Sequence, residues 1–444
     1  MASSVNGRDL ALQTLLTITR DGEYSHIALK KILDEHQYLD KKERAFITRL
    51  VNGTLERMIE IDYILNLFSK TKVNKMKPVV RMILRTGVYQ LKYMDYVPAS
   101  AVCNEAVKLA VQKGFAGLKG FVNGVLRNIS RNIGSICYPS KENLNAYLSV
   151  CCSLPEWIVE QWLREYGPET AEQIGQTFLE ERPVTVRCNL EAVHKEELVR
   201  ELEKEGVAAE ETVLPYALAI SGFDYIAKLE SFQKGHFYVQ DLSSMYVAEW
   251  ADPSEGDCII DVCAAPGGKA IHMAEKLSGS GHVQARDLTD YKVGLLKENI
   301  ARSRLTNIEA VKRDATVEDE AVREKADIVI ADLPCSGLGV IGRKIDLKYK
   351  MTPETQKDLI RLQREILSVV HTYVKPGGRL LYSTCTLHRG ENQENTRWFL
   401  REHPQFCLRK EEQMLPGRDC GDGFYIAMFE KENSVMPGEC PPDR

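Results

Sequence analysis

Apolar residues recur at three- and four-residue spacings across residues 8–130, without the alternation of β-branched residues that is typical of strands. This period predicts consecutive amphipathic helices and hence an all-helical first domain. One predicted helix has recognisable ends. Pro98 and Ser100 mark its start, residues 101–113 form its body, and Gly114 occupies the position of a C-terminal cap.

A short sequence echo lies within this helical region. The pattern Val-Asn-Gly-x-Leu occurs at residues 51–55 and again at residues 122–126. The match is too brief to establish a repeat, so we expect each Asn-Gly pair to lie where two helices pack closely. A functional role for either asparagine is the less favoured interpretation.

The pattern changes twice further along the chain. Periodicity is lost over residues 131–150, and residues 153–232 mix helix-like with strand-like stretches, which indicates a connection and then a small α+β insert. From residue 233, short apolar runs alternate with helical stretches, which predicts a doubly wound, mostly parallel sheet in an α/β domain. We therefore predict four regions, the last a flexible tail: residues 1–135, 136–232, 233–432 and 433–444.

Composition narrows the class of protein. The 444 residues exceed the size of a single hydrophobic core, and the 44% hydrophobic and 27% charged content is ordinary for a globular protein. The first 22 residues show no basic stretch followed by a long apolar run, and no later apolar segment approaches membrane-spanning length, so we expect a cytoplasmic protein without a membrane partner. The twelve cysteines contain no CxxC pair, so we expect no metal site.

Charge is unevenly distributed along the chain. Residues 1–140 carry 21 Lys and Arg against 12 Asp and Glu, a net charge of +9, whereas the whole chain carries −5. A basic N-terminal domain favours a nucleic-acid partner. Ordinary solvation of helix surfaces explains the same surplus equally well at this point.

A loop of small residues follows the first strand of the α/β region. Residues 261–269 read Asp-Val-Cys-Ala-Ala-Pro-Gly-Gly-Lys and connect a strand to a helix, so a ligand can approach their backbone closely. Asp287 ends the second strand, where it can accept hydrogen bonds from the hydroxyls of a ribose, or alternatively cap the next helix. Asp314 follows the third strand and is placed to reach an adenine amino group.

The ends of the next two strands carry reactive groups. Asp332-Leu-Pro-Cys-Ser336 ends the fourth strand and Tyr382-Ser-Thr-Cys-Thr386 the fifth, so Cys335 and Cys385 are expected to face one pocket. Carboxylates at this edge would repel a pyrophosphate and attract a positive centre, which favours a sulfonium nucleoside as cofactor.

Two thiols and a carboxyl group beside a nucleoside cofactor predict covalent catalysis on a pyrimidine, although either cysteine alone would be interpreted as a buried apolar residue. Carbon 5 of a cytosine accepts a methyl group only after a thiolate has added at carbon 6. Asp332, held near N3, would then need to be protonated or to share a proton.

These three motifs together resemble the RNA cytosine-5 methyltransferases. The resemblance implies a Rossmann-like class I methyltransferase domain, S-adenosylmethionine as cofactor, Cys385 as nucleophile and Cys335 as the thiol for product release. Leu333 stands where that family has a small residue or proline, a departure that removes no reacting group. The resemblance places the cofactor on the following residues: Cys263, Ala264, Ala265, Pro266, Gly267, Gly268, Lys269, Asp287, Asp314 and Asp332.

The basic helical region resembles the NusB-like RNA-binding fold, particularly over residues 120–131. This domain pairing, together with residues 240–244 and 422–425, resembles the subfamily that methylates 16S ribosomal RNA of the small subunit. We therefore expect a monomeric enzyme with that RNA as its partner, and no DNA.

Two alternatives stay open. The same chemistry could act on tRNA or another ribosomal site, since the helical domain argues for small-subunit RNA only by analogy. A non-catalytic RNA-binding or antitermination factor is the other, and the presence of both Cys385 and Asp332 disfavours it. The four basic residues that follow the Cys335 motif form either a rim for RNA or a solvated loop: Arg343, Lys344, Lys348 and Lys350.

Overall fold

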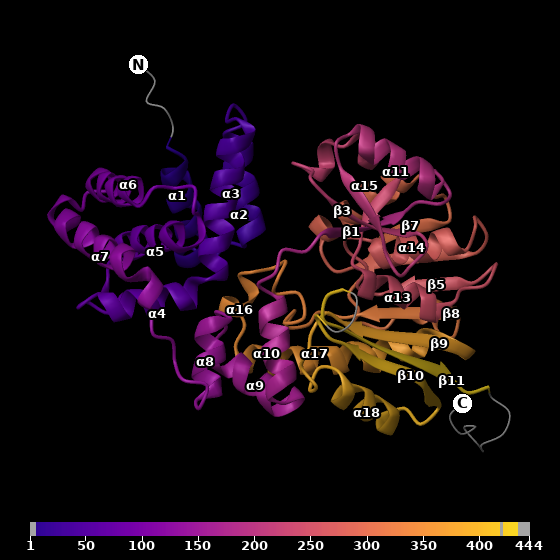
Figure 1. The fold of residues 1–444 in the computed structure, drawn as a ribbon. Coiled ribbons are helices and arrows are strands. Elements are labelled where there is room, and N and C mark those ends of the chain that lie inside the picture. The colour runs from indigo at the N-terminus through magenta and orange to yellow at the C-terminus, as the bar shows by residue number, and fades with distance from the viewer. Residues whose placement is uncertain (1–5, 418–420, 434–444) are drawn as a thin grey trace. The chain divides into compact units, whose positions relative to one another are not determined.

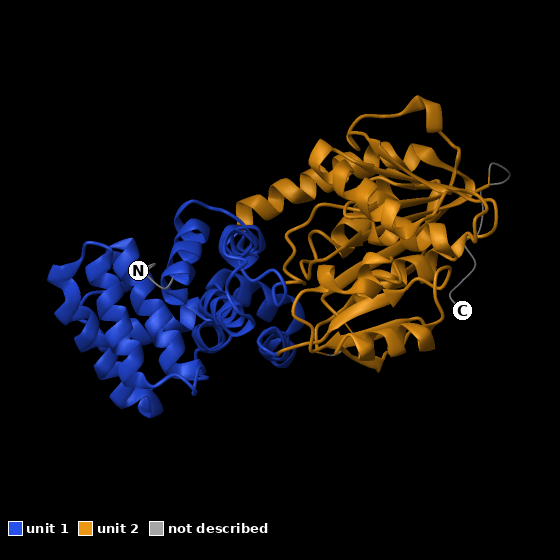
Figure 2. Ribbon diagram, turned by 90° about the horizontal axis from the view of Figure 1, so that it is seen from above, with its two compact units in different colours: residues 1–180, 341–350 blue, residues 181–340, 351–444 orange. Residues whose placement is uncertain are grey.

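The computed structural model describes residues 6–417 and 421–433, which form two compact units (Figure 2). The first comprises residues 1–180 and 341–350, and the second comprises residues 181–340 and 351–444. The region boundaries stay predictions, and the predicted tail lies outside the described residues apart from Asn433. Within the described ranges, none of the helices is long and apolar enough to cross a membrane.

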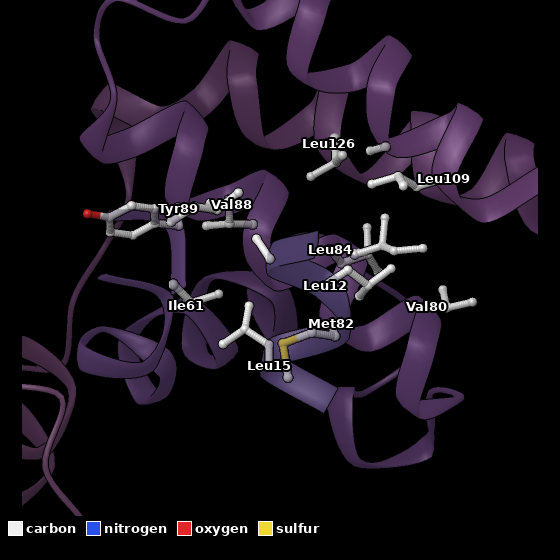
Figure 3. Packing of buried hydrophobic residues seen from close by; sticks show 14 of the residues in the cluster. Leu12, Leu15, Ile61, Val80, Met82, Leu84, Val88, Tyr89, Leu109 and Leu126 are labelled. Carbon is white, nitrogen blue, oxygen red and sulfur yellow. The ribbon is translucent and has the colours of Figure 1, made fainter. Parts of the chain in front are cut away.

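The first unit is helical, as the three- and four-residue period predicted. Its central helix is α5 (Pro78–Tyr93), which contacts five other helices and is buried continuously over residues 82–90. Figure 3 shows Leu84 and Val88 of this helix among the side chains of the surrounding core. The helices of this unit are α1 (Gly7–Arg20), α2 (Ser25–Glu35), α3 (Lys41–Glu56), α4 (Met58–Phe68), α5, α6 (Ala99–Gln112), α7 (Lys119–Asn132), α8 (Leu144–Cys151), α9 (Glu156–Tyr166), α10 (Pro168–Thr177) and α16 (Leu347–Lys350), with short 3-10 turns η1 (Val73–Lys75), η2 (Ala116–Leu118) and η3 (Ile133–Ser135).

The predicted ends of α6 are confirmed. Pro98 is its N-cap residue, and Gly114 follows the C-cap with a φ of +87°, a conformation that glycine adopts without strain. The amide of Phe115 donates to the carbonyl of Ala110 at 2.8 Å, and the amide of Gly114 donates to that of Val111 at 3.1 Å. These two bonds close the helix in the Schellman manner.

The two Asn-Gly pairs occupy different environments. A Cβ atom on Gly53 would lie 2.0 Å from the ring of Tyr89, so α3 and α5 approach each other closely at this point. A Cβ atom on Gly124 would meet nothing within 4 Å. Close packing is therefore confirmed for the first pair and wrong for the second.

We expect Gly53→Ala to lower the free energy of unfolding by about 1–3 kcal/mol, because the added methyl group must displace the buried ring of Tyr89. Gly124→Ala is the matched control and should raise that free energy by about 0.5–1 kcal/mol, because alanine is the better helix former. Urea unfolding of both variants measures this contrast. Equal effects of the two substitutions would contradict it.

The second unit contains a small antiparallel sheet with strand order β2-β3-β1-β4. This sheet and its helices confirm the α+β insert that the mixed pattern predicted. β4 lies beyond residue 232 and pairs with β1 from Val186↔Val239 to Cys188↔Phe237. The elements are β1 (Val184–Cys188), α11 (Lys195–Lys204), β2 (Ala208–Glu211), β3 (Ala217–Ser221), η4 (Ile226–Lys228), α12 (Glu230–Gln233) and β4 (Phe237–Val239).

The large sheet has strand order β10-β11-β9-β8-β5-β6-β7 (Figure 1). Strands β9, β8, β5, β6 and β7 are parallel, and β11 and β10 extend the sheet in antiparallel pairing. The elements are α13 (Leu242–Ala251), β5 (Cys258–Asp261), α14 (Gly268–Lys276), β6 (His282–Asp287), α15 (Asp290–Ser303), β7 (Ile308–Lys312), η5 (Glu320–Val322), β8 (Ala326–Asp332), α17 (Pro353–Val370), η6 (His371–Tyr373), β9 (Val374–Thr384), α18 (Gln393–Glu402), β10 (Phe406–Met414) and β11 (Phe424–Lys431).

Both faces of this sheet are buried, which explains its continuous apolar strands. Ile259 and Ile330 join one core with residues of α13, α14 and α15, whereas their neighbours Ile260 and Val329 join a second core with residues of α17 and α18. Successive side chains of a strand point to opposite faces. The predicted doubly wound α/β fold is confirmed, and its strand order reverses between β5 and β8, where ligands bind such sheets.

Candidate active site

Four aspartates lie at or just beyond the carboxyl ends of neighbouring parallel strands. Asp261, Asp287 and Asp332 are the last residues of β5, β6 and β8, and Asp314 follows β7. The predicted residues therefore lie at the carboxyl ends of the parallel strands, around the point between β5 and β8 where the strand order reverses.

The loop between β5 and α14 is held by Asp287. The side chain of Asp287 is 2% exposed and accepts a hydrogen bond from the amide of Ala265 at 3.1 Å. Thr289, rather than Asp287, caps α15 through the amide of Lys292. Gly267 has a φ of +112°, and a Cβ atom there would lie 3.2 Å from Leu296, so glycine suits this turn.

Asp332 and Lys269 form an ion pair at this edge. The ammonium of Lys269 donates to Oδ2 of Asp332 at 2.7 Å, and the hydroxyl of Ser383 donates to Oδ1 at 2.9 Å. Burial alone would lower the pKa of Lys269, but the carboxylate of Asp332 raises it above its ordinary value. The pair therefore holds a proton on the amine, hydrogen-bonded to the carboxylate.

Asp261 is a candidate site residue that was not predicted from the sequence. It is 1% exposed, and its Oδ2 atom has no hydrogen-bond partner within the described part of the chain. Burial, and then the negative charge of Asp332, raises the pKa of Asp261 to about 8. A buried carboxyl oxygen without a partner destabilises the fold unless a ligand donates a hydrogen bond to it. Burial and the missing partner indicate a ligand-binding role for Asp261, and neither can be read from its position at the end of a strand.

Asp314 lies further along the same edge. Its Oδ1 atom accepts hydrogen bonds from the amide and the hydroxyl of Thr316, at 2.9 and 2.7 Å, and the hydroxyl bond lowers its pKa. These bonds orient the carboxylate within the turn that follows β7.

The two cysteines of the strand-end motifs lie together, as expected. Their sulfur atoms are 3.3 Å apart, and both side chains are partly exposed. The hydrogen bond with Cys385, and then burial, raises the pKa of Cys335 well above its ordinary value. Cys335 therefore retains its proton, while Lys269 interacts electrostatically with Cys385.

A buried carboxylate supports both cysteine loops. Glu391 is fully buried and accepts hydrogen bonds from the amide and hydroxyl of Ser336, at 2.8 and 2.6 Å, and from Gln363 at 3.0 Å. The hydroxyl of Ser336 also bonds with that of Thr386 at 2.7 Å. Hydrogen bonds therefore hold each loop at the residue that follows its cysteine. No sequence motif indicated that Glu391 has this role.

We expect Glu391→Gln to lower the free energy of unfolding by about 1–3 kcal/mol, because its amide group cannot accept all three donors. We also expect Cys335 to be alkylated at lower pH, because a displaced loop weakens its bond with Cys385. The pH profile of iodoacetamide labelling, read at each cysteine by mass spectrometry, measures this. Exposed Glu394→Gln is the control, and an unchanged Cys335 profile in Glu391→Gln would contradict this role.

Two further segments noted in the sequence meet beside this site. Oδ1 of Asp241 accepts a hydrogen bond from the amide of Asp422 at 2.9 Å. The ammonium of Lys269 lies 5.2 Å from the centre of the Phe424 ring, and the Gln240 side chain lies next to Gly268. Residues 240–244 and 422–425 therefore enclose the end of the loop that carries Lys269.

The basic residues after the Cys335 motif do not act as one rim. Lys348 is 2% exposed and donates to the carbonyl of Glu56 at 2.7 Å, so the rim interpretation is wrong for it. Lys350 donates to the carbonyls of Gly22 and Glu23, within the helical unit. Arg343 and Lys344 are exposed, and their contact with RNA stays a prediction.

Burial lowers the pKa of Lys348 to about 7, so the unfolded chain binds more protons than the folded one between pH 7 and 10.5. We therefore expect Lys348→Met to stabilise the protein most below pH 7. This advantage should shrink by up to about 1.4 kcal/mol per pH unit across that window. Urea unfolding from pH 6 to 9.5 tests it, with exposed Lys344→Met as control, and a constant difference would contradict it.

Comparison with known protein families defines the class to which this fold and site belong. A family model described as 16S rRNA methyltransferase RsmB/F matches residues 248–430, and the NusB family model matches residues 5–131. A model for the ferredoxin-like domain of RsmF/B-like methyltransferases matches residues 154–224. The chain is thus a Rossmann-type methyltransferase with a NusB-family domain at its N-terminal side.

Individual relatives narrow this class. The chain is 37% identical to the probable ribosomal RNA small subunit methyltransferase B of Bacillus subtilis, with 96% of this chain and 98% of that protein covered. It is 32% identical to the protein of the same description from Synechocystis, with 96% and 100% covered. The crystal structure of PH0851 matches with a TM-score of 0.80 at 25% identity, over 96% of this chain and 99% of that one. This chain belongs to the ribosomal RNA small subunit methyltransferase B family.

Proposed function

We propose that the protein transfers a methyl group from S-adenosylmethionine to carbon 5 of a cytosine in 16S ribosomal RNA. The observation that carries this proposal is the 3.3 Å approach of the Cys335 and Cys385 sulfur atoms, beside the Lys269–Asp332 ion pair. The descriptions of the family model and of the relatives support the RNA substrate.

The residues at the strand ends suit S-adenosylmethionine. When bound, it supplies a methyl group on a positively charged sulfur. The carboxylates at the end of the sheet favour such a positive group. The loop from Cys263 to Lys269 allows close approach to its backbone, Asp287 lies at the position expected for a ribose, and Asp261 offers its unpartnered Oδ2 atom.

Cys385 is the nucleophile in this proposal. Its thiolate forms a bond to carbon 6 of the cytosine, and the ring becomes electron-rich at carbon 5. The positive charge of Lys269 favours the thiolate form of Cys385. Asp332 shares a proton with Lys269 at 2.7 Å, so this pair can donate to N3 of the ring as the adduct forms.

Cys335 assists the release of the product. Carbon 5 gains the methyl group and then loses its proton to solvent water, while the bond between carbon 6 and the Cys385 sulfur breaks and the double bond of the ring is restored. The proton on N3 returns to the Lys269–Asp332 pair. The departing sulfur of Cys385 leaves as a thiolate. Because Cys335 retains its proton and lies 3.3 Å away, it can donate a hydrogen bond to that thiolate and make it a better leaving group.

The target cytosine must leave its base stack to reach Cys385, which costs a few kcal/mol. In this proposal, contacts between the protein and the RNA backbone offset that cost. The helical unit suits such contacts because residues 1–140 carry a net charge of +9.

We expect the parent protein to form labelled 5-methylcytosine in unmodified small-subunit RNA from labelled S-adenosylmethionine. Cys385→Ala should reduce the rate at least about a thousand-fold, because no other group replaces the nucleophile. Cys335→Ala should accumulate a covalent RNA adduct, visible on a denaturing gel. Cys258→Ala, at the opposite end of β5, is the control and should retain activity.

Transfer to tRNA instead of small-subunit RNA would overturn the substrate and leave the chemistry intact. Activity that survives Cys385→Ala would overturn the covalent mechanism. RNA binding without any methyl transfer, in a protein shown to bind S-adenosylmethionine, would favour the binding-factor alternative.

A further inference from the structure

A basic hollow of about 450 Å³ lies within the helical unit, in residues that the site described above does not use. It is formed by the end of α4, the turn η1 and the first two turns of α5. The charged side chains that line it are Asp62, Lys72, Lys75, Arg81 and Arg85.

The one carboxylate among these lining residues is already paired. The Nε and Nη2 atoms of Arg85 donate to the two carboxylate oxygens of Asp62, at 2.7 and 2.6 Å, in the bidentate geometry that gives the strongest ion pairs. Among the described residues, the amine of Lys72 donates to a backbone carbonyl, that of Asn66, at 3.1 Å. Lys72, Lys75 and Arg81 therefore leave a local surplus of positive charge.

Arg81 carries most of that surplus inside the hollow. Its Nε atom is buried and has no hydrogen-bond partner among the described residues. It lies one helical turn before Arg85, so two like charges face each other on α5. Burial, and then the charge of Arg85, lowers the pKa of Arg81. A buried donor without a partner destabilises the fold unless an acceptor binds there.

Hydrogen bonds and apolar contacts within the chain hold the residues that form the hollow in place. Oδ1 of Asn66 accepts a hydrogen bond from the amide of Val73 at 2.9 Å, and the hydroxyl of Ser69 binds the carbonyl of Thr71 at 2.9 Å. Val73 and Met76 anchor the turn in the helical core. Lys72 and Lys75 are thus exposed at the rim, whereas Arg81 is partly buried and its Nε atom fully so.

We propose that this hollow binds a phosphate group, held by the guanidinium of Arg81 and the ammonium groups of Lys72 and Lys75, and that its occupant is a phosphodiester of the substrate RNA backbone. A guanidinium presents parallel N–H donors that match phosphate oxygens. The choice of RNA rests on the proposed function, and the three cations at the hollow supply the positive charge that a polyanion requires.

The test compares the full-length parent with Arg81→Gln, using Arg164→Gln as a control of equal charge change on the exposed surface of α9. We expect Arg81→Gln to raise the Kd for a small-subunit RNA fragment about five-fold. The slope of log Kd against log salt should fall by about 1, as expected for one lost phosphate contact. Arg164→Gln should change both quantities less.

Inorganic phosphate at constant ionic strength should raise the melting temperature of the parent but not that of Arg81→Gln. Arg81→Gln should itself melt no lower than the parent, because it removes a buried donor, the Nε atom, that has no partner among the described residues. Methyl transfer should show a raised KM for RNA with an unchanged kcat, since the hollow contains no reacting group.

The outcomes separate this inference from the proposed function. Equal RNA affinity and salt slope in the parent and Arg81→Gln, or equal losses in both variants, would overturn the site even if methylation is observed. A response to inorganic phosphate without a change in RNA affinity would overturn RNA as the occupant. Loss of RNA affinity in Arg81→Gln alone would support the site even if the parent methylates no RNA.

Discussion

The parallel pairing of β8 with β9 is the constraint on which the candidate site depends. Asp332 lies opposite Ser383 in that register, and the hydroxyl of Ser383 donates to Asp332. Cys335 and Cys385 follow these two residues by three and two positions, so the register brings their sulfur atoms together. A shift of one residue would turn every side chain of one strand to the other face of the sheet.

Burial on both faces prevents such a shift. Ile328 and Ile330 fill one core, whereas Val329 and Ala331 fill the other, and Leu381 and Tyr382 of β9 divide in the same way. The loops beyond the strands have no such cores, and hydrogen bonds hold them instead. Glu391 performs that task from α18's N-terminal side, accepting donors from the first loop and lying beside the Ser336–Thr386 bond that joins the two.

Two lysines lie among the carboxylates at the same edge: Lys269 pairs with Asp332 and Lys292 pairs with Asp287. Lys269 binds Asp332 and interacts with Cys385, so it links the loop of small residues to the paired thiols. Asp261 lies behind that ion pair with a raised pKa, because it is buried and faces the charge of Asp332. In the helical unit the balance of charge is reversed. Its basic side chains outnumber its carboxylates over residues 1–140 and around the hollow.

Much of this protein follows from its sequence. The apolar period predicted the helices around α5, because those positions must be buried wherever the helices pack. The strand–helix alternation predicted the doubly wound sheet. The strand-end motifs predicted that Asp287, Asp332, Cys335 and Cys385 lie at one edge, because all parallel strands end there. Only the tertiary structure decided the roles of Glu391, Lys348 and Arg81, whose partners lie far away in sequence or are missing among the described residues. Burial and pairing are properties of the packed chain, so spacing alone does not report them.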